Sequence, residues 1–596
     1  MTSAEIRKRF LEFFAKRGHV VVPSSSLLSD DPTVLLTTAG MQQFKLYYTG
    51  ARDPGKDIHP TLEKPLGARR AASVQKSFRT SDVELVGDES HLTFFEMLGN
   101  FSFGPAPAGY FKKEAIEWGY EFITKEMGLE VDAVSVFAGD PSTSSGQAVP
   151  FDQESYEIWK GLGIPEEKIK RAGREDNFWG PTGAEGPCGP TTEIYVDGLE
   201  VWNIVFNEYY CHPDKTLTKL ESPGVDTGMG LERLAMVSQN LNDVFQTDLF
   251  RPVLEEIRGD DIRAKRIIAD HLRGATVLIS DGVLPSNIGA GYILRRLLRR
   301  AIRYGKVLGL KRDFYVPIVK AATIIYKDQY PEVRNAESDI LTVIQNEEER
   351  FGKALEQGLK EFERLVKDGI SGVEAFRLYE SYGFPFELTQ ELAKERGVEI
   401  AEEDFRKEFE RHQDVSRAGA EKKFGGHGLK LETGELHANT EEEVSIVTRL
   451  HTATHLLQAA LRNVLGPEVK QMGSDITPER TRFDFTFSRK LTAGEVKAVE
   501  DLVNEQIRKD LPVASVELPL EEAKKTGALY FFKEKYPPVV TVYSIGPDPS
   551  TSSGLPFSRE FCGGPHVTRT GEIGRFRITK EESSSAGVRR IRAIVE

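Results

Sequence analysis

The sequence contains few cysteines and no long hydrophobic segment. Three cysteines in 596 residues exclude a scaffold held together by disulfides. No apolar run approaches the ~18 residues that a membrane-spanning helix needs. The first residues, Met1–Arg7, lack the apolar core of a secretory signal. We therefore expect a soluble, cytoplasmic protein with no membrane partner.

Basic residues are also in the minority. The chain has 78 lysines and arginines against 92 aspartates and glutamates, which gives a net charge of −14. This balance argues mildly against a general nucleic-acid binder, but it does not exclude a local basic surface. A hydrophobic fraction of 39% and a charged fraction of 29% are ordinary for a globular protein. The length predicts about three or four domains.

The chain divides into regions with different patterns. Residues 1–240 combine amphipathic helical spacing, as in Ile6–Phe14, with short apolar runs typical of strands. Residues 241–415 are mostly helical, residues 416–447 are polar like a linker, and residues 448–596 again mix helices with strands. We predict an α+β multidomain fold with these boundaries. The predicted strands include Val20–Val22, Val34–Leu36, Val201–Phe206, Arg482–Phe487, Val539–Tyr543 and Arg575–Thr579.

The heptapeptide Asp-Pro-Ser-Thr-Ser-Ser-Gly occurs twice, at Asp140–Gly146 and at Asp548–Gly554. Runs of serine, threonine and glycine are typical of flexible loops. The two copies lie in unrelated sequence surroundings, so they do not indicate a structural repeat. We expect two inserted surface loops and assign them no chemistry.

Two segments of the first region have residue types that suit a nucleotide. Gln75–Asp82 and His91–Gly104 predict a hairpin with an arginine and several aromatic side chains. Arginine can bind phosphate with two hydrogen bonds, and an aromatic ring offers a face to adenine. Gly228–Arg233 adds glycines that allow close backbone approach and an arginine at a helix start. On composition alone, a core hairpin with solvated charges and a plain strand-to-helix turn remain alternatives.

The segment Thr93–Gly104 resembles motif 2 of the alanyl-tRNA synthetases. The resemblance covers almost the whole chain, and it implies a class II synthetase core, an antiparallel sheet flanked by helices. It also implies a two-step reaction: alanine and ATP give alanyl-adenylate, and the alanyl group then moves to the 3′ end of tRNA(Ala). The further blocks that resemble the family, in the same order, are Thr38–Met41, Asn177–Gly180, Gly186–Pro190, Trp202–Phe206 and Val225–Arg233.

The resemblance implies roles for single residues. Arg79 is expected on the α-phosphate of ATP, Arg233 on the γ-phosphate, and Asp226 on the alanine ammonium. Phosphoryl chemistry of this kind calls for arginines and for Mg²⁺ with ATP more than for a protein nucleophile. Glu193 is expected to contact Mg²⁺ or the ribose. The other residues expected around alanine and ATP are Met41, Phe95, Met97, Trp179, Val205 and Gly228.

A pocket small enough for alanine cannot reject every competitor. Steric exclusion removes large side chains, but it rejects the smaller glycine poorly, and the added hydroxyl of serine is also hard to refuse. An enzyme of this class therefore needs a second, hydrolytic site. We expect that site in the C-terminal third of the chain.

Two short motifs in that third predict a metal site. His451 and His455 stand at positions i and i+4 of one helix face, and Cys562 and His566 add a thiol and a third imidazole. One cysteine and three histidines suit tetrahedral Zn²⁺. The alternative is two buried histidines and an unrelated cysteine–histidine pair. The glutamate of a His-Glu-x-x-His motif is absent, which argues against a metalloprotease.

These two motifs resemble the zinc-binding editing domain of the alanyl-tRNA synthetases, which hydrolyses seryl- and glycyl-tRNA. Gln471 matches an editing-site position of the family. Pro565 stands where the family usually has threonine, and the family's usual β-barrel segment with Gly-Gly-Gln has no match. The resemblance implies one Zn²⁺ in this domain and a deacylase activity toward mischarged tRNA(Ala).

An arginine-rich helix is the expected tRNA surface of this acidic chain. The segment Tyr292–Arg303 places apolar residues on one side and five arginines on the remainder. The alternative is a solvated helix face paired with acidic neighbours. By resemblance, Asn287 and Glu387 are expected near the acceptor-stem G·U pair, in the wide minor groove of A-form RNA. The five arginines are Arg295, Arg296, Arg299, Arg300 and Arg303.

The residues leave two other functions open. One is a stand-alone hydrolase of mischarged tRNA with a degenerate synthetase core, which the presence of Arg79, Asp226 and Arg233 disfavours. The other is a non-catalytic RNA-binding protein, which bound zinc and tRNA charging would exclude. The family's usual C-terminal tRNA-binding and dimerising region has no counterpart after the metal-site segment. We therefore expect a monomer.

Overall fold

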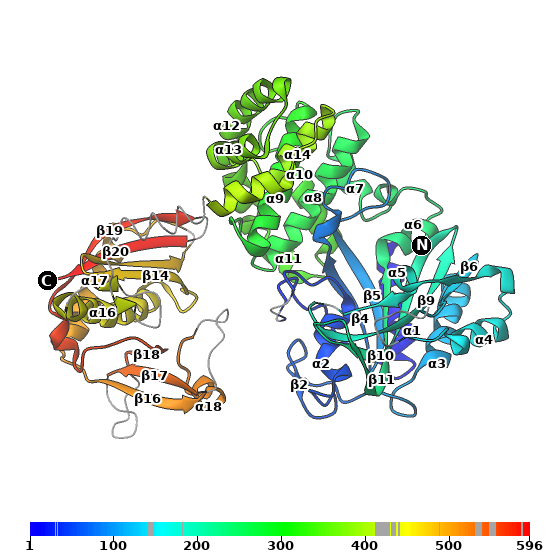
Figure 1. Cartoon of the computed structure of the whole chain (residues 1–596), viewed down its shortest axis with the longest axis horizontal. Coiled ribbons are helices and arrows are strands. Elements are labelled where there is room, and N and C mark those ends of the chain that lie inside the picture. The colour runs from blue at the N-terminus through cyan, green and yellow to red at the C-terminus, as the bar shows by residue number, and fades with distance from the viewer. Residues whose placement is uncertain are drawn as a thin grey trace. The chain divides into compact units, whose positions relative to one another are not determined.

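A computed structural model of the chain shows two compact units, Met1–Glu408 and Phe409–Glu596 (Figure 1). We describe each unit by itself. No helix among the described residues is long and apolar enough to cross a bilayer. The residues described are 1–29, 31, 34–140, 148–181, 183–411, 429–430, 437–438, 441–487, 489–530, 539–546, 556–585 and 588–596.

A nine-stranded sheet forms the centre of the first unit. Its middle strands are antiparallel, and parallel pairs occur only towards the two edges, between β1 and β4 and between β6 and β7. Strand β8 (Phe178–Trp179) pairs with β9 beside this row. The antiparallel core expected from the resemblance is therefore confirmed. The row of strands is β1 (Val20–Val21), β4 (Arg70–Phe78), β5 (Phe94–Ser102), β11 (Leu217–Gly230), β10 (Leu199–Cys211), β9 (Gly186–Val196), β6 (Ala133–Phe137) and β7 (Ile169–Ala172).

Helix α1 (Ser3–Ala15) covers part of this sheet. Thr2 and Glu5 form a capping box at its start, which satisfies two of the free amide groups there. The helix turns Phe10 and Phe14 into the core, where Phe10 meets Phe122 edge to face at 5.5 Å between ring centroids. The predicted helix over Ile6–Phe14 is confirmed, and it is longer by a few residues at its start.

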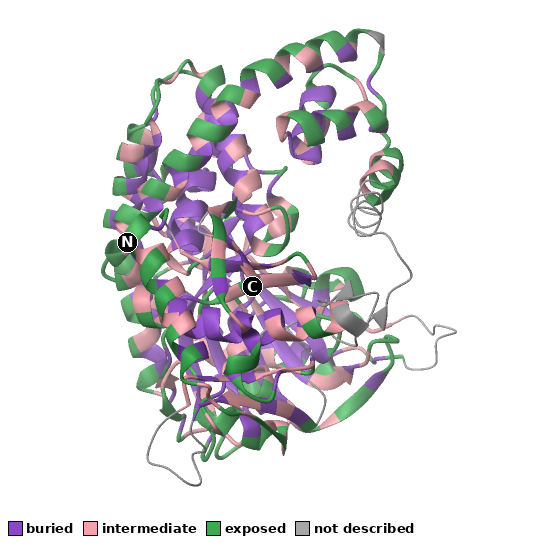
Figure 2. Ribbon diagram, turned by 90° about the vertical axis from the view of Figure 1, so that its left-hand side faces the viewer, coloured by how far each residue is buried: buried purple, intermediate pink, exposed green. Residues whose placement is uncertain are grey.

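The helices that follow the sheet share its hydrophobic core. One contiguous set of buried residues runs from Ile6 of α1 to Ile344 of α12, so the core continues past residues 240 and 241. Buried residues follow the central strands and the inner helix faces, as Figure 2 shows. The predicted domain boundary between residues 240 and 241 stays a prediction. The helices are α6 (Leu231–Ser238), α7 (Arg251–Glu255), α8 (Ile262–Ser280), α9 (Gly289–Val307), α10 (Tyr315–Tyr326), α11 (Pro331–Asn335), α12 (Glu337–Leu365), α13 (Gly372–Tyr382) and α14 (Phe386–Glu395).

One predicted strand of the first unit is wrong. Val34–Leu36 forms bends and no ladder. Leu36 is buried in the same core as Leu27, and the amide of Thr37 donates to the carbonyl of Leu27 at 2.8 Å. The apolar run therefore anchors a loop on the core, which a short apolar pattern does not distinguish from a strand.

The second unit packs two helices on a four-stranded antiparallel sheet. A three-stranded antiparallel sheet carries the cysteine motif at the end of β18. Helix α16 begins at Glu441, so the last residues of the predicted linker 416–447 are helical, and most of the others lie outside the described residues. The elements are α16 (Glu441–Leu465), α17 (Ala493–Arg508), β14 (Gln471–Thr477), β15 (Arg480–Thr486), β19 (Phe576–Ser585), β20 (Val588–Val595), β16 (Val513–Pro519), β17 (Val539–Ile545) and β18 (Ser558–Phe561).

The two copies of the heptapeptide fall almost entirely outside the described residues. Only Asp140, the first residue of the first copy, is described. Its carboxylate pairs with the guanidinium of Arg174 at 2.6 Å. The expectation of two surface loops stays a prediction.

Candidate active site and metal site

A cavity of about 330 Å³ lies on the central strands of the nine-stranded sheet. Its walls come from β5, β10 and β11, from the start of α6, from the loop between β4 and β5, and from Trp179 of β8. The lining residues are Thr38, Ala39, Arg79, Asp82, Ser90, His91, Leu92, Phe95, Met97, Trp179, Glu200, Val201, Asn203, Val205, Asp226, Gly228, Gly230, Glu232 and Arg233.

The cavity brings together eight of the ten residues predicted for alanine and ATP. The two others are close in the fold but are not among the lining residues. Met41 is fully buried in an aromatic cluster that Met97 and Trp179 also contact. Glu193, on β9 beside Asn203, accepts hydrogen bonds from Ser135 at 2.9 Å and Tyr195 at 2.6 Å. The eight are Arg79, Phe95, Met97, Trp179, Val205, Asp226, Gly228 and Arg233.

Asp226 is a buried acid of the cavity with a strongly perturbed pKa. It lies on β11 directly opposite Val205 of β10, and both side chains line the cavity. Burial raises the pKa of its carboxyl from 3.8 to about 7. A carboxylate held in so dry a place favours a cationic partner, because an opposite charge offsets the lost hydration.

The cavity is narrow beside Asp226. A Cβ atom on Gly228 would lie 3.0 Å from the sulfur of Met97, so a side chain there would displace Met97. The same sulfur accepts a hydrogen bond from the amide of Gly40 at 3.3 Å. Glycine at position 228 thus keeps open a space of limited size next to the carboxylate.

Two arginines stand at other parts of the cavity. Arg79 directly follows β4, and its guanidinium carbon lies 5.0 Å from the ring centroid of Phe95. Arg233, in the first turn of α6, donates to the carboxylate of Glu200 at 2.9 Å and to its carbonyl at 3.2 Å. Arginine and an aromatic ring therefore face one space, as the hairpin pattern predicted.

The sequence interpretation missed several lining residues. His91 accompanies Asp88, with 2.5 Å between Nδ1 and Oδ2, and it lies inside the segment already suspected of nucleotide binding. Glu200 had no local signal, because it meets Arg233 only through the pairing of β10 with β11. Asn203 also lines the cavity, and its side-chain oxygen has no hydrogen-bond partner in the described structure.

Four side chains of the second unit form a cluster that could hold a metal ion. The ligand atoms of His451, His455, Cys562 and His566 all lie within 4.8 Å of one another. The sulfur of Cys562 is 3.3 Å from Nε2 of His451 and 3.4 Å from Nε2 of His566. The fold therefore brings together two motifs that are more than 100 residues apart in the sequence.

The other ring nitrogen of each histidine has its own partner. Nδ1 of His451 donates to the carbonyl of Pro565 at 3.0 Å, and Nδ1 of His455 pairs with Glu560 at 2.9 Å. Nδ1 of His566 is 3.1 Å from the hydroxyl of Thr452. Partners of this kind fix the tautomer and orientation of metal-binding histidines. Pro565 takes part through its carbonyl, which proline offers like any other residue.

The electrostatics of the cluster favour a thiolate. Burial opposes ionisation of Cys562, but hydrogen bonds from the three histidines outweigh it and lower the pKa of the thiol to about 2. Burial lowers the pKa of His566 to about 3, so this ring is neutral. Burial opposes a charge on His455, but Glu560 and Cys562 raise the pKa of this ring well above its ordinary value, so it carries a proton. A thiolate and neutral imidazoles are the protonation states that bind metals, so metal binding to this cluster would release that proton.

Gln471 lies at the first position of β14, opposite Phe485 of β15. It is half-buried and does not belong to the four-residue cluster. Its assignment to an editing site stays a prediction.

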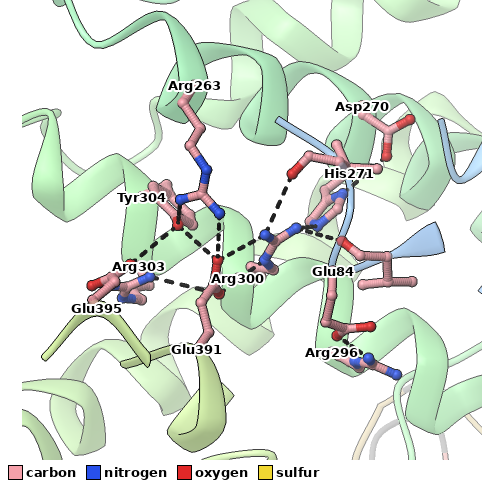
Figure 3. A network of polar contacts seen from close by, with 12 residues as sticks. Glu84, Arg263, Asp270, His271, Arg296, Arg300, Arg303, Tyr304, Glu391 and Glu395 are labelled. Carbon is pink, nitrogen blue, oxygen red and sulfur yellow. Dashed lines mark hydrogen bonds and ion pairs between the residues drawn. The ribbon is translucent and has the colours of Figure 1, made fainter. Parts of the chain in front are cut away.

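The arginines of α9 do not form an open basic surface. Arg300 and Arg303 are only 4% and 5% exposed, and both pair with Glu391 of α14 (Figure 3). Arg295 and Arg299 lie beside Glu347 of α12 at 3.5 and 2.7 Å. The arginine face of α9 is thus paired with acidic neighbours, as the alternative interpretation of the sequence expected. It differs from that alternative because the face is largely buried rather than solvated. Contact of these arginines with tRNA stays a prediction.

The two residues expected at the acceptor stem also have partners. Asn287 precedes α9 and accepts a hydrogen bond from Arg295. Glu387, in the first turn of α14, accepts from the hydroxyl of Tyr292 at 2.8 Å and pairs with Arg296 at 3.4 Å. Both lie in the first unit, next to the arginine-rich helix.

Comparisons with known proteins identify the family. The family described as "tRNA synthetases class II (A)" matches residues 5–466, and the "Threonyl and Alanyl tRNA synthetase second additional domain" matches residues 540–592. An alanine–tRNA ligase of Treponema pallidum is 44% identical, over 99% of this chain and 98% of that protein. Those of Treponema denticola and Borreliella afzelii are 44% and 42% identical, over 100% of this chain and 99% and 100% of those proteins.

The antiparallel sheet with its arginine-lined cavity, together with the match over residues 5–466, defines a class II tRNA synthetase. Full-length identity above 40% narrows the assignment further. The chain belongs to the alanine–tRNA ligase family.

Proposed function

We propose that this chain activates L-alanine with ATP and transfers the alanyl group to the 3′ end of tRNA(Ala). The observation that carries the proposal is one cavity that joins Arg79, Asp226 and Arg233 on a class II synthetase sheet. A stand-alone deacylase with a degenerate core is not favoured, because all three residues are present and face the same space.

The positions of these side chains support the proposed roles. Asp226 holds the alanine ammonium, and Val205, Trp179 and Gly228 limit the space for the side chain. An oxygen of the alanine carboxylate attacks the α-phosphorus, and the bond to pyrophosphate breaks. Arg79 and Arg233 stabilise the charge on the phosphate oxygens. The 3′-terminal ribose hydroxyl of tRNA then attacks the alanyl carbonyl, and AMP leaves.

Mg²⁺ fits this site mainly as a partner of the ATP phosphates. Of the carboxylates that line the cavity, Glu200 pairs with Arg233 and Glu232 pairs with Arg273. Mg²⁺ keeps several waters and commonly binds substrate phosphates with few protein ligands. When bound, it supplies positive charge to the phosphates.

We also propose that the second unit hydrolyses Ser-tRNA(Ala) and Gly-tRNA(Ala). The observation that favours this second activity is the cysteine and histidine cluster, inside a unit that matches the second additional domain of threonyl and alanyl synthetases. One sulfur and three imidazoles fit Zn²⁺. His451, His455, Cys562 and His566 would hold the ion, which would supply Lewis-acid chemistry for ester hydrolysis.

The decisive experiment is a charging assay with purified protein, alanine, ATP and tRNA(Ala). We expect alanine-dependent ATP–pyrophosphate exchange and formation of Ala-tRNA, and weaker charging when G·C replaces the acceptor-stem G·U pair. Absence of exchange would favour the deacylase instead. For the oligomeric state we propose a monomer, which light scattering of the same preparation tests.

The pH dependence of alanine activation provides a further prediction. Only the ionised carboxylate of Asp226 pairs with the substrate ammonium, and burial raises its pKa to about 7. We expect kcat/KM for alanine to fall about tenfold between pH 8 and pH 6, because this parameter reports groups of the free enzyme. Exchange kinetics in buffers of constant ionic strength measure the effect. A flat profile over this range would contradict the role of Asp226.

A further inference from the structure

The loop between β4 and β5 has two sides with different surroundings. Residues 79–93 supply Arg79, Asp82, Ser90, His91 and Leu92 to the cavity. In the middle of the same loop, Val83 and Val86 are fully buried in the core shared with α8 and α9. The shape of the cavity wall therefore depends on what holds the buried side of the loop. We call residues 79–93 the cavity loop.

Arg300 of α9 holds the buried side of the cavity loop. Its guanidinium donates to the carbonyl oxygens of Val83 at 2.5 Å and Val86 at 3.4 Å. It also donates to the carboxylate of Glu391 of α14 at 2.7 and 3.0 Å. A planar guanidinium has five N–H donors on three nitrogens, so it can reach two separate carbonyls and a carboxylate at once, whereas a lysine has three donors on a single nitrogen. One buried side chain thus joins the loop to α14.

Arg296, one turn earlier on α9, makes a second connection of the same kind. It pairs with Glu84 of the cavity loop and, at 3.4 Å, with Glu387 of α14. Arg266 of α8 holds the cavity loop at another point, because it donates to the carbonyl of Gly87 at 3.2 Å. Figure 3 shows Arg296 beside Glu84, and Arg300 between Glu391 and His271.

The end of the cavity loop joins the same network. The carboxylate of Asp270 accepts from the amide and hydroxyl of Thr93 at 3.0 and 2.6 Å. It also accepts from Nδ1 of His271 at 2.9 Å, and Nε2 of that ring accepts from Arg300 at 3.0 Å. This assignment needs a neutral ring, and burial lowers the pKa of His271 accordingly. The network thus reaches both the middle of the loop and its last residue.

We propose that Arg296 and Arg300 are positioning residues that hold the cavity loop in the shape that binds ATP, with Glu387 and Glu391 of α14 as anchors. The arginine row of α9 then acts inside the protein, on the nucleotide side of the reaction. Neither arginine is among the residues that line the cavity, so the effect passes through Arg79, Ser90 and His91. The inference rests on the proposed function, because it names ATP as the ligand of this loop.

A matched pair of glutamates tests the proposal. Glu84 and Glu395 have similar side-chain exposure, 44% and 41%, and each pairs with one arginine of α9, but only Glu84 lies on the cavity loop. For Glu84→Ala we expect the KM for ATP in pyrophosphate exchange to rise about fivefold, with the KM for alanine within about twofold of wild type. For Glu395→Ala we expect both constants to stay unchanged.

Arg300→Lys extends the test to the buried connection. Lysine keeps the charge near Glu391 but lacks the fork that reaches two carbonyls, so we expect ATP kcat/KM to fall about 20-fold with little change for alanine. Circular dichroism checks folding, and Glu84→Ala remains informative if the lysine variant does not fold. The positioning role would be overturned if Glu84→Ala and Glu395→Ala changed the KM for ATP equally. It would also be overturned if a variant lost as much kcat/KM for the substrate alanine as for ATP. Wild-type protein without exchange would instead overturn the proposed function.

Discussion

Replacement of Asp226 by asparagine is expected to lower kcat/KM for alanine in ATP–pyrophosphate exchange by about 1,000-fold. The amide keeps the shape of the side chain but removes the negative charge that we propose pairs with the substrate ammonium. Asp226 lies in a cavity with little solvent, where burial alone raises its pKa to about 7. An ammonium placed there without a counter-charge loses its hydration and gains no ion pair in return.

The same substitution is expected to stabilise the folded protein. The pKa of Asp226 is about 7 in the folded protein, above its ordinary value of 3.8, so the free energy of unfolding falls as the pH rises between these values. Above pH 7 the ionised side chain therefore lowers the stability of the substrate-free protein by about 2–4 kcal/mol. Asparagine carries no charge and avoids this loss. Thermal unfolding at pH 8 and pH 4 measures this, and the gain should be present at pH 8 and absent at pH 4.

Asp197→Asn provides the matched control for this charge removal. Asp197 lies in the exposed turn between β9 and β10, outside the cavity, with a positive φ of 50° that asparagine also adopts. We expect wild-type exchange and an unchanged pH dependence of stability. Exchange by Asp226→Asn within tenfold of wild type would show that Asp226 does not bind the ammonium.

Removal of two metal ligands is expected to separate the activities of the two units. For the double variant Cys562→Ser and His455→Ala we expect bound zinc to fall from about one per chain to near zero. Deacylation of Ser-tRNA(Ala) should fall at least about 100-fold, whereas alanine-dependent exchange should stay within about threefold. The reason is that all residues of the cavity lie in the first unit and all four ligands lie in the second.

Metal analysis by mass spectrometry and unfolding with and without a chelator give readouts that do not depend on activity. A chelator should lower the unfolding temperature of the second unit in wild type and leave the double variant unaffected. His212→Ala, a histidine of the first unit that contacts Thr218, is the control and should keep its zinc. Unchanged zinc content in the double variant, or unchanged deacylation, would refute the metal site.

Many residue types of both candidate sites could be predicted from the sequence, because they lie in short motifs with a chemical signature or in blocks that resemble a known family. The glycines and arginine of Gly228–Arg233 indicated a phosphate site, and His451 and His455 share a helix face through their spacing alone. The partners of these groups could not be predicted. Glu560 and the carbonyl of Pro565 orient the histidines through contacts that only the fold creates.

The arginine-rich helix shows the limit of sequence patterns most directly. The spacing of Arg296, Arg300 and Arg303 indicated an amphipathic helix and predicted an outward basic face. The structure covers that face with α14, whose Glu387, Glu391 and Glu395 repeat every four residues along one side. The sequence contains this acidic repeat, but the arginines that pair with it lie about 90 residues away, so local spacing does not predict the contact.

The sequence by itself determined the class of enzyme, the motifs that supply most residues of the two candidate sites and the helical period of the arginine row. These properties depend on local spacing and on side-chain chemistry, which the order of residues contains. Only the tertiary structure decided which charges meet. A charged helix face looks the same whether water or another helix neutralises it, and the difference depends on contacts between distant segments. That difference places Arg300 in the interior, behind the cavity loop and hydrogen-bonded to Val83, rather than on the surface.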